Sequence, residues 1–227
     1  MPTIAIIPAR GGSKGLPGKN IIDFHGKPLI YWTVKAALDS GCFDSVIAST
    51  DSQEIADAAL ASGATVPGLR PPHLATDEAT THDVIVYTLD QSPADTVVVL
   101  QPTSPLRTAN DIRACLDMYR NTGRPVVSAT PAKPWIFTMI GDVATPAFDF
   151  TARRQDAEFL APNGAVYVFS DEYVRDNRQW WGDAILYVMP QERSVDIDTP
   201  TDLVIAKALF SPPRLDVSEE IAWRMAL

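Results

Sequence analysis

Residues 8–20 read PARGGSKGLPGKN, and this glycine-rich stretch decides how the rest of the chain is interpreted. It lies between an apolar run at Thr3–Ile7, typical of a buried strand, and a helix-like segment at Pro28–Leu38. Because glycine has no Cβ, backbone N–H groups in such a loop can approach an anion closely. Three cations also lie among the glycines: Arg10, Lys14 and Lys19. The stretch therefore predicts a triphosphate-binding loop at the carboxyl end of the first strand.

Two familiar phosphate-binding motifs do not fit this loop. The Walker A motif needs glycine five positions before its Gly-Lys pair and serine or threonine directly after it, whereas Ser13 and Asn20 occupy those places. The G-x-G-x-x-G fingerprint of dinucleotide-binding folds is absent as well. A surface loop that is merely rich in glycine and lysine is the alternative interpretation.

Composition and charge bound the class of protein. With 227 residues, 46% of them hydrophobic, we expect a single domain over residues 1–227. No apolar run is long enough to span a bilayer, and no basic region with a cleavage site precedes the first strand, which favours a cytoplasmic protein. Cys42 and Cys115 lie far apart, as expected of free thiols. A net charge of −9 without a basic cluster argues against nucleic acid or an anionic membrane as a partner.

Short apolar runs alternate along the chain with longer segments that carry apolar residues at three- and four-residue spacing. The expected strands are Thr3–Ile7, Ser45–Ser49, Thr96–Leu100, Pro125–Thr130, Ala165–Phe169 and Ala184–Met189. The expected helices are Pro28–Leu38, Gln53–Ala61, Thr80–Leu89, Ala109–Tyr119 and one that ends near Leu209. This alternation predicts an α/β fold with a mostly parallel sheet and right-handed crossovers. Ligands of such sheets bind beyond the carboxyl ends of the strands.

Polar segments follow several of these strands. Ser49–Ser52 comes after the second strand, and the proline-rich stretch Arg70–Thr81 supplies a cation and several hydroxyls that could line a pocket. Gln101–Arg107 follows a continuously apolar strand and predicts a rigid polar platform for a ligand. The first and last of these segments have a structural alternative as helix caps, with the candidates Asp51 or Ser52 and Thr108 or Asn110.

The acidic segment Ser194–Asp202 precedes the last expected helix. Thr199 fits the N-cap of that helix and Pro200 its first position, but capping leaves Asp196 and Asp198 unexplained. In an extended segment these two side chains point the same way, and paired carboxylates repel unless a cation lies between them. Hard oxygen ligands suit Mg²⁺, so the pair predicts a magnesium site. A solvated acidic turn is the alternative.

The alternation breaks down between residues 131 and 162. Within this excursion, Pro134–Ile140 is strongly apolar and flanked by turn residues. An apolar excursion from an otherwise complete α/β pattern often covers a partner subunit, so it predicts a dimer contact. A lid over the domain's own edge is the alternative.

Several motifs together make the chain resemble the CMP-N-acetylneuraminic acid synthetases, also called acylneuraminate cytidylyltransferases. The resemblance runs from about Ile4 to Leu209 and rests on motifs in the family's order: IPARGGSKGLPGKN at 7–20, STD at 49–51, RP at 70–71 with LATD at 74–77, LQPTSPLR at 100–107, PNGAVY at 162–167 and DIDT at 196–199. It implies a Rossmann-like nucleotidyltransferase fold and a homodimer. It also implies a Mg²⁺-dependent reaction of CTP with a nine-carbon α-keto acid sugar, giving the CMP-sugar and pyrophosphate.

The same resemblance implies roles for individual residues. Arg10, Lys19 and Asp198 would be catalytic, and Asp196 and Asp198 would hold Mg²⁺. Nucleotide contacts would come from Ala9, Arg10, Lys19, Asn20, Arg70, Ala79, Thr81 and Gln101. Sugar contacts would come from Gln101, Ser104, Arg153, Arg154, Asn163 and Tyr167.

One departure from the family pattern bears on the sugar. The family commonly has a lysine shortly after the proline of the excursion, near the sugar carboxylate, but Trp135, Ile136 and Phe137 follow Pro134 here. Either Lys133 substitutes, or the sugar is a relative such as pseudaminic or legionaminic acid. KDO cytidylyltransferases lack the Gly-Gly-Ser-Lys form of the loop and fit less well. A non-catalytic nucleotide-sugar-binding module is the alternative outside enzymes, since fold alone permits it.

Overall fold

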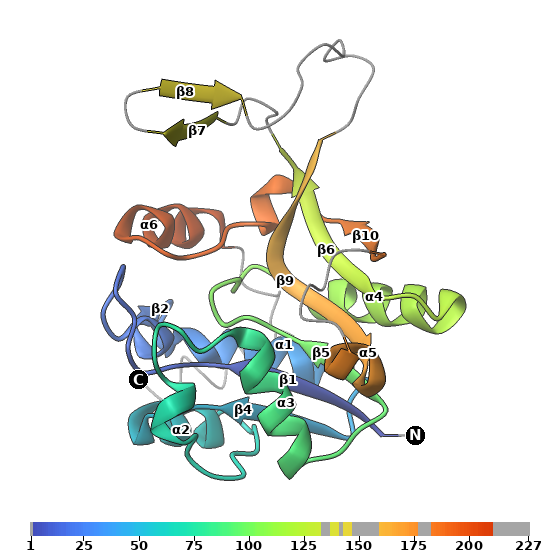
Figure 1. Cartoon of the computed structure of the whole chain (residues 1–227). Coiled ribbons are helices and arrows are strands. Elements are labelled where there is room, and N and C mark those ends of the chain that lie inside the picture. Colours follow the sequence, from blue (N-terminus) through green and yellow to red (C-terminus); the bar gives the residue numbers. More distant parts are fainter. Residues whose placement is uncertain (1, 133–136, 141–142, 147–158, 177–182, 211–227) are drawn as a thin grey trace, which may run out of the picture.

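The computed structural model describes residues 2–132, 137–140, 143–146, 159–176 and 183–210. Its centre is a six-stranded sheet with the strand order β10-β6-β9-β5-β1-β4 (Figure 1). These strands are β1 (Thr3–Pro8), β4 (Ser45–Ser49), β5 (Thr96–Val99), β6 (Val126–Pro131), β9 (Leu160–Ser170) and β10 (Ile185–Val188). β1 pairs in parallel with β4 and β5, and β10 with β6, whereas β9 runs antiparallel to both of its neighbours. The predicted α/β fold with a mostly parallel sheet is confirmed.

The predicted helices are present, and their starts are set by local capping. The structure has α1 (Leu29–Ser40), α2 (Gln53–Ala61), α3 (Thr81–Gln91), α4 (Ala109–Thr122) and α6 (Pro200–Leu209). Ser52 caps α2, and α3, α4 and α6 each begin with a complete capping box, at Thr80, Thr108 and Thr199. A short helix, α5 (Asp171–Asp176), was not predicted, and neither were the 3₁₀ turns η1 (Lys19–Ile21), η2 (Pro72–Leu74) and η3 (Gln191–Arg193).

Two small hairpins stand apart from the main sheet. β2 (Asp23–Phe24) pairs with β3 (Lys27–Pro28) directly before α1. β7 (Phe137–Ile140) pairs with β8 (Val143–Pro146) inside the excursion, beyond the ends of β6 and β9 (Figure 1). The sequence pattern showed where the alternation stops but did not predict either hairpin.

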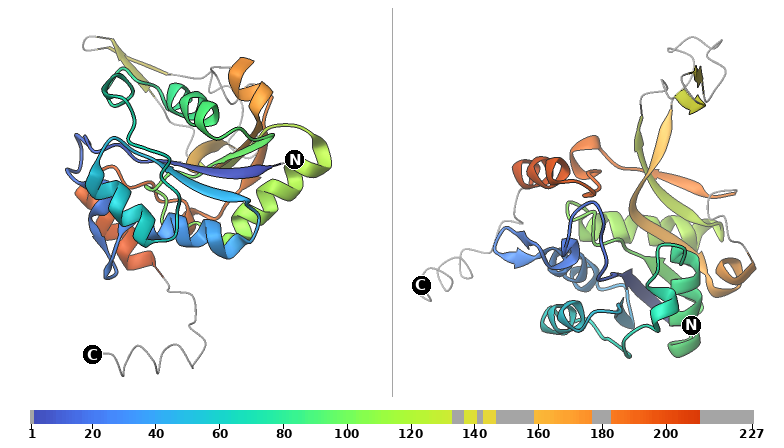
Figure 2. Two further views of the ribbon diagram at one scale, coloured as in Figure 1. Left: turned by 90° about the horizontal axis from the view of Figure 1, so that it is seen from below. Right: turned by 60° about the vertical axis from the view of Figure 1, so that its left-hand side comes forward.

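The sheet is covered on both faces. Ala5 and Ile7 of β1 pack into an apolar cluster with α1, α2 and α4, while Ile4 and Ile6 pack into a second cluster with α3 and α5. Figure 2 shows these helices on opposite sides of the sheet. With both faces covered, the exposed edge at the carboxyl ends of β1 and β5 remains for a ligand. Among the described helices, none is long and apolar enough to cross a membrane.

Candidate active site

A cavity of about 640 Å³ opens where β1 and β5 end. Its walls come from the glycine-rich loop, from the 70–84 stretch, from the loop after β5 and from the acidic segment before α6. Seven of the residues with predicted nucleotide contacts line it: Arg10, Lys19, Asn20, Arg70, Ala79, Thr81 and Gln101. The remaining one, Ala9, is buried, and its N–H donates to the Ser49 carbonyl at 2.9 Å. The structure therefore brings these distant segments together around one space.

The glycine-rich loop is held in shape by its neighbours. The Gly11 N–H donates to the Asp51 carboxylate at 3.0 Å, so Asp51 fixes this loop and leaves the capping of α2 to Ser52. The buried Asn20 amide donates to the Arg10 carbonyl at 2.9 Å. A Cβ on Gly15 would lie only 2.6 Å from the Asp198 carbonyl oxygen. Glycine at this position therefore allows the loop to lie directly against the acidic segment.

Each loop cation is paired with a carboxylate from another segment. Arg10 lies 3.0 Å and Lys14 2.6 Å from Asp77, and Lys19 lies 2.7 Å from Asp198. The hydrogen bond from Lys14, together with Arg10, holds the pKa of Asp77 below its usual value. The triphosphate-binding loop predicted from its cations thus already faces negative charge. Anionic phosphates entering the cavity have to replace these contacts.

Arg70 lies in the wall of the cavity and is nearly inaccessible to solvent. Burial lowers the pKa of its guanidinium, and the neighbouring Asp51 carboxylate, 3.4 Å away, opposes that shift. Its Nε has no hydrogen-bond partner among the described residues. Arg70 therefore places a buried positive charge in the wall of the cavity, and its Nε is a donor beneath the surface that no described residue satisfies.

The acidic segment is attached to the loop after β5. The Ile197 N–H donates to the Thr103 carbonyl at 2.8 Å, and the Thr103 hydroxyl also hydrogen-bonds Asp196. Gly164 has a positive φ of 75°, a conformation that favours glycine, and a Cβ on it would be in ordinary contact with Asp196 at 3.4 Å and with Gln101 at 3.5 Å. Asp196 and Gln101 therefore converge on one glycine at the edge of the cavity.

Whether Asp196 and Asp198 suit a metal can be judged from their surroundings. Desolvation raises the pKa of Asp196, the Asp198 charge adds to that shift, and the Thr103 hydroxyl opposes it. No cluster of three or more His, Cys, Asp or Glu side chains converges among the described residues. Mg²⁺ commonly takes only one or two protein carboxylates and completes its shell with water and substrate phosphates. Two carboxylates are thus enough for a cation that arrives with a nucleotide. Of the two, only Asp198 lines the cavity, and the magnesium site stays a prediction.

Three residues with predicted sugar contacts lie beneath the cavity surface. Ser104, Asn163 and Tyr167 are all buried and do not line the cavity. The Asn163 side chain accepts from Ser128 at 2.6 Å and donates to Ser194 at 2.9 Å. These bonds show a structural role for Asn163. The sugar contacts of all three residues stay predictions. Arg153 and Arg154 lie outside the described residues.

Tyr167 stands in the core next to the acidic segment. Burial raises the pKa of its phenol to about 12, with a further contribution from the charge of Asp196. Its ring stacks near Phe169, with centroids 6.3 Å apart. The phenol is therefore neutral at ordinary pH.

Sequence reasoning missed the role of Asp77. In the sequence Asp77 stands out only as part of the LATD motif, yet its carboxylate holds both Arg10 and Lys14 and lines the cavity. The available signal was a carboxylate within a proline-rich stretch that also supplies predicted nucleotide contacts.

Comparison with known proteins agrees with this geometry. The family model described as "Cytidylyltransferase" matches residues 4–179. The CMP-N,N'-diacetyllegionaminic acid synthase of Legionella pneumophila is 37% identical over 92% of this chain and 97% of that protein. The N-acylneuraminate cytidylyltransferase of Streptococcus agalactiae is 37% identical over 90% of this chain and 52% of that protein. The pseudaminic acid cytidylyltransferase of Campylobacter jejuni is 33% identical over 92% of this chain and 97% of that protein.

A solved structure shares the fold at lower identity. It is a CMP:2-keto-3-deoxy-manno-octonic acid synthetase complexed with CTP, with a TM-score of 0.75 and 18% identity over 92% of this chain and 98% of that one. This likeness shows the fold, and the family model and the relatives establish the family. The chain belongs to the cytidylyltransferases, among relatives that include the N-acylneuraminate cytidylyltransferases.

Proposed function

We propose that this chain transfers the cytidylyl group of CTP to a sialic-acid-like nine-carbon α-keto acid sugar, releasing pyrophosphate. The observation that carries the proposal is the cavity itself. In one space it brings the loop cations, Arg70 and the acidic segment together, in a chain that belongs to the cytidylyltransferases. Relatives named for legionaminic, N-acylneuraminic and pseudaminic acids support an acidic nine-carbon acceptor.

The reaction joins a sugar hydroxyl to the α-phosphorus of CTP. The hydroxyl oxygen forms the new bond and loses its proton to solvent, while the bond from the α-phosphorus to the bridging oxygen breaks and pyrophosphate leaves with the electron pair. Such transfer depends mainly on positioning and on stabilising charge at the phosphoryl oxygens. The protein has therefore to hold the triphosphate in line and neutralise the leaving group.

The cavity residues divide this work. Arg10 and Lys19 neutralise the leaving pyrophosphate after exchanging their carboxylate partners for phosphate oxygens. Following the resemblance, we assign Asn20 and Arg70 to the cytidine and Gln101 to a place between nucleotide and sugar; all three line the cavity. Arg70 contributes a buried positive charge to the wall of the cavity.

We assign Asp196 and Asp198 as the carboxylates that would hold Mg²⁺. When bound there, Mg²⁺ supplies Lewis-acid polarisation of the α-phosphate and favours ionisation of the sugar hydroxyl. The chain's own contribution is to hold the two carboxylates against the loop after β5, through Ile197 and Thr103. That anchoring keeps the acidic segment in place before the nucleotide binds.

The excursion is proposed to form a homodimer contact. Residues 134–140 are strongly apolar, and the resemblance places this region at the neighbouring subunit's site. Light scattering coupled to gel filtration would test the dimer, and a monomer at all concentrations would contradict it.

Because the reaction consumes CTP, we also propose that the enzyme is cytoplasmic.

Pyrophosphate release with Mg²⁺ and CTP tests the function, measured against N-acetylneuraminic, legionaminic, pseudaminic and KDO acids. We expect release with one or two of the nine-carbon acids and little with KDO, which has eight carbons. The contrary result is no pyrophosphate release with any sugar, either with CTP or with UTP, ATP or GTP in its place. That result would contradict the transfer reaction and favour a nucleotide-sugar-binding module.

A further inference from the structure

The buried carboxylate of Asp111 joins three separate elements. It lies on α4 and is inaccessible to solvent. One oxygen accepts the capping bonds of Thr108, from its N–H at 2.8 Å and its hydroxyl at 2.7 Å. The other accepts from the Tyr187 hydroxyl of β10 at 3.0 Å and from Arg193 Nη2 of η3 at 2.7 Å. Capping of α4 accounts for the two bonds from Thr108 to the first oxygen. It does not account for the bond from Arg193 to the second oxygen.

Arg193 is placed directly before the acidic segment. It ends η3, and Asp196 and Asp198 follow it at three and five residues. Ser194 is fixed as well, because its hydroxyl accepts from Asn163 at 2.9 Å and donates to the Pro190 carbonyl at 2.8 Å. The chain that leads into the two aspartates is therefore anchored to the core on its amino-terminal side.

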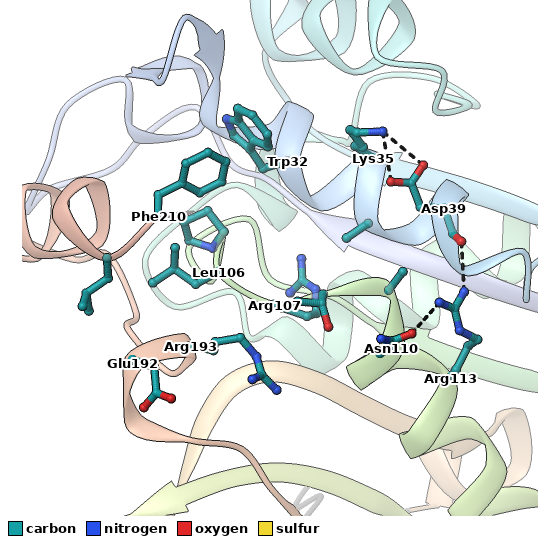
Figure 3. Close-up of a pocket in the computed structure, with 15 residues that line it drawn as sticks. Trp32, Lys35, Asp39, Leu106, Arg107, Asn110, Arg113, Glu192, Arg193 and Phe210 are labelled. Atoms are coloured by element: carbon teal, nitrogen blue, oxygen red, sulfur yellow. Dashed lines mark hydrogen bonds and ion pairs between the residues drawn. The ribbon is translucent and has the colours of Figure 1, made fainter. Parts of the chain in front are cut away.

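Arg193 itself lies away from the active-site cavity. Figure 3 shows it with Glu192 in the wall of a second cavity, of about 480 Å³, which Lys35 of α1 and Arg113 of α4 also line. The two cavities share no lining residue. Any effect of Arg193 on the reaction is then indirect, and the segment that it anchors is the shortest connection to the two aspartates.

We propose that Arg193 is a positioning residue for cytidylyl transfer, whose ion pair with buried Asp111 sets the place of Asp196 and Asp198. The inference rests on the proposed function of the acidic segment as the metal site. A guanidinium that donates two bonds to one carboxylate, here at 2.7 and 3.4 Å, fixes direction as well as distance. Groups that orient metal ligands typically change metal affinity or activity by about 10- to 100-fold when removed.

The test compares Arg193→Met with Arg113→Met. Arg113 lines the same cavity but bonds the carbonyls of Asp39 and Ser40 and the side chain of Asn110, so it is a matched control without contact to the acidic segment. We expect Arg193→Met to raise the Mg²⁺ concentration for half-maximal turnover and to lower kcat by about tenfold or more. CTP affinity measured without metal should change by less than about twofold, and Arg113→Met should resemble the wild type in both respects.

A readout without turnover separates this inference from the proposed function. Mn²⁺ affinity in the presence of CTP, followed by electron paramagnetic resonance, should weaken in Arg193→Met even if no sugar supports the reaction. Arg193→Lys keeps the positive charge but lacks the forked geometry of the guanidinium, so its Mn²⁺ affinity should lie between those of the wild type and Arg193→Met. Arg193→Lys replaces Arg193→Met in the test if the latter does not fold. Wild-type Mn²⁺ affinity in both Arg193 variants, or equal losses in Arg113→Met, would overturn the proposal.

Discussion

The ammonium of Lys19 lies 2.7 Å from the carboxylate of Asp198, so the residue predicted to bind the triphosphate is paired with one predicted to bind the metal. Lys19 is largely buried in this pair, whereas most of the Asp198 side chain is exposed. In the free protein each group neutralises the other. A nucleotide that takes Lys19 onto its phosphates leaves the Asp198 carboxylate without its cation, which favours binding of Mg²⁺ at the same moment.

Replacing Lys19 should therefore impair the transfer step. We expect Lys19→Met to lower kcat by about 10²- to 10³-fold, the loss usual when one donor to developing charge is removed. Steady-state pyrophosphate release measures it. Lys207→Met is the control, since Lys207 pairs with Asp23 at 3.4 Å on the surface and does not line the cavity. An unchanged kcat in Lys19→Met would remove Lys19 from the mechanism.

Asp198→Asn should abolish turnover without weakening metal-free CTP affinity, because the change also releases Lys19 from its ion pair. The amide keeps the shape of the side chain but cannot supply the negative charge that Mg²⁺ requires. Calorimetric CTP titrations without metal, run beside the activity assay, separate the two effects. Asp117→Asn, at an exposed position paired with Arg120, provides the control. Lost CTP binding with normal turnover would refute the metal assignment.

Asp77 should compete with phosphates for the loop cations. Asp77→Asn frees Arg10 and Lys14, so we expect pyrophosphate to inhibit a few-fold more strongly at low ionic strength, with the gain shrinking as salt is added. Product-inhibition constants at several salt concentrations measure this effect. Weaker inhibition in the variant would mean instead that Asp77 holds the two cations in the geometry that phosphates need.

Gly15 should tolerate no side chain. A Cβ there would lie 2.6 Å from the Asp198 carbonyl oxygen, so Gly15→Ala has to push the glycine-rich loop and the acidic segment apart. A displacement of this kind can cost about 10²-fold in kcat/KM. Gly68→Ala is the control, because a Cβ on Gly68 would meet nothing within 4 Å. Equal activity of the two variants would show that the contact does not matter for turnover.

Much of this fold follows from local sequence, and the parts that do not are long-range. Apolar periodicity and the caps at Thr80, Thr108 and Thr199 depend on neighbouring residues, so strand and helix positions were predictable. The direction of β9 was not, because periodicity is the same for parallel and antiparallel strands. Its early start at Leu160 arises from pairing of residues 160–162 with β6, and the register shifts before pairing resumes at Tyr167, across the part of β9 that holds Asn163 and Gly164.

The cavity was predictable in its main parts for a similar reason. The glycine-rich loop and the paired aspartates are short motifs whose chemistry is visible in the sequence. The ion pairs that hold them were not, since Arg10 and Asp77 are 67 residues apart and Asp111 and Arg193 are 82. Which carboxylate meets which cation depends on strand order, and spacing along the chain does not reveal it.

The most direct test of the account is pyrophosphate release from CTP and Mg²⁺ with the panel of acidic sugars. The account predicts release that depends on a nine-carbon α-keto acid sugar and on CTP, with the CMP-sugar formed in equal amount. Absence of release with every sugar and every nucleoside triphosphate, from a protein that still binds CTP, would contradict it.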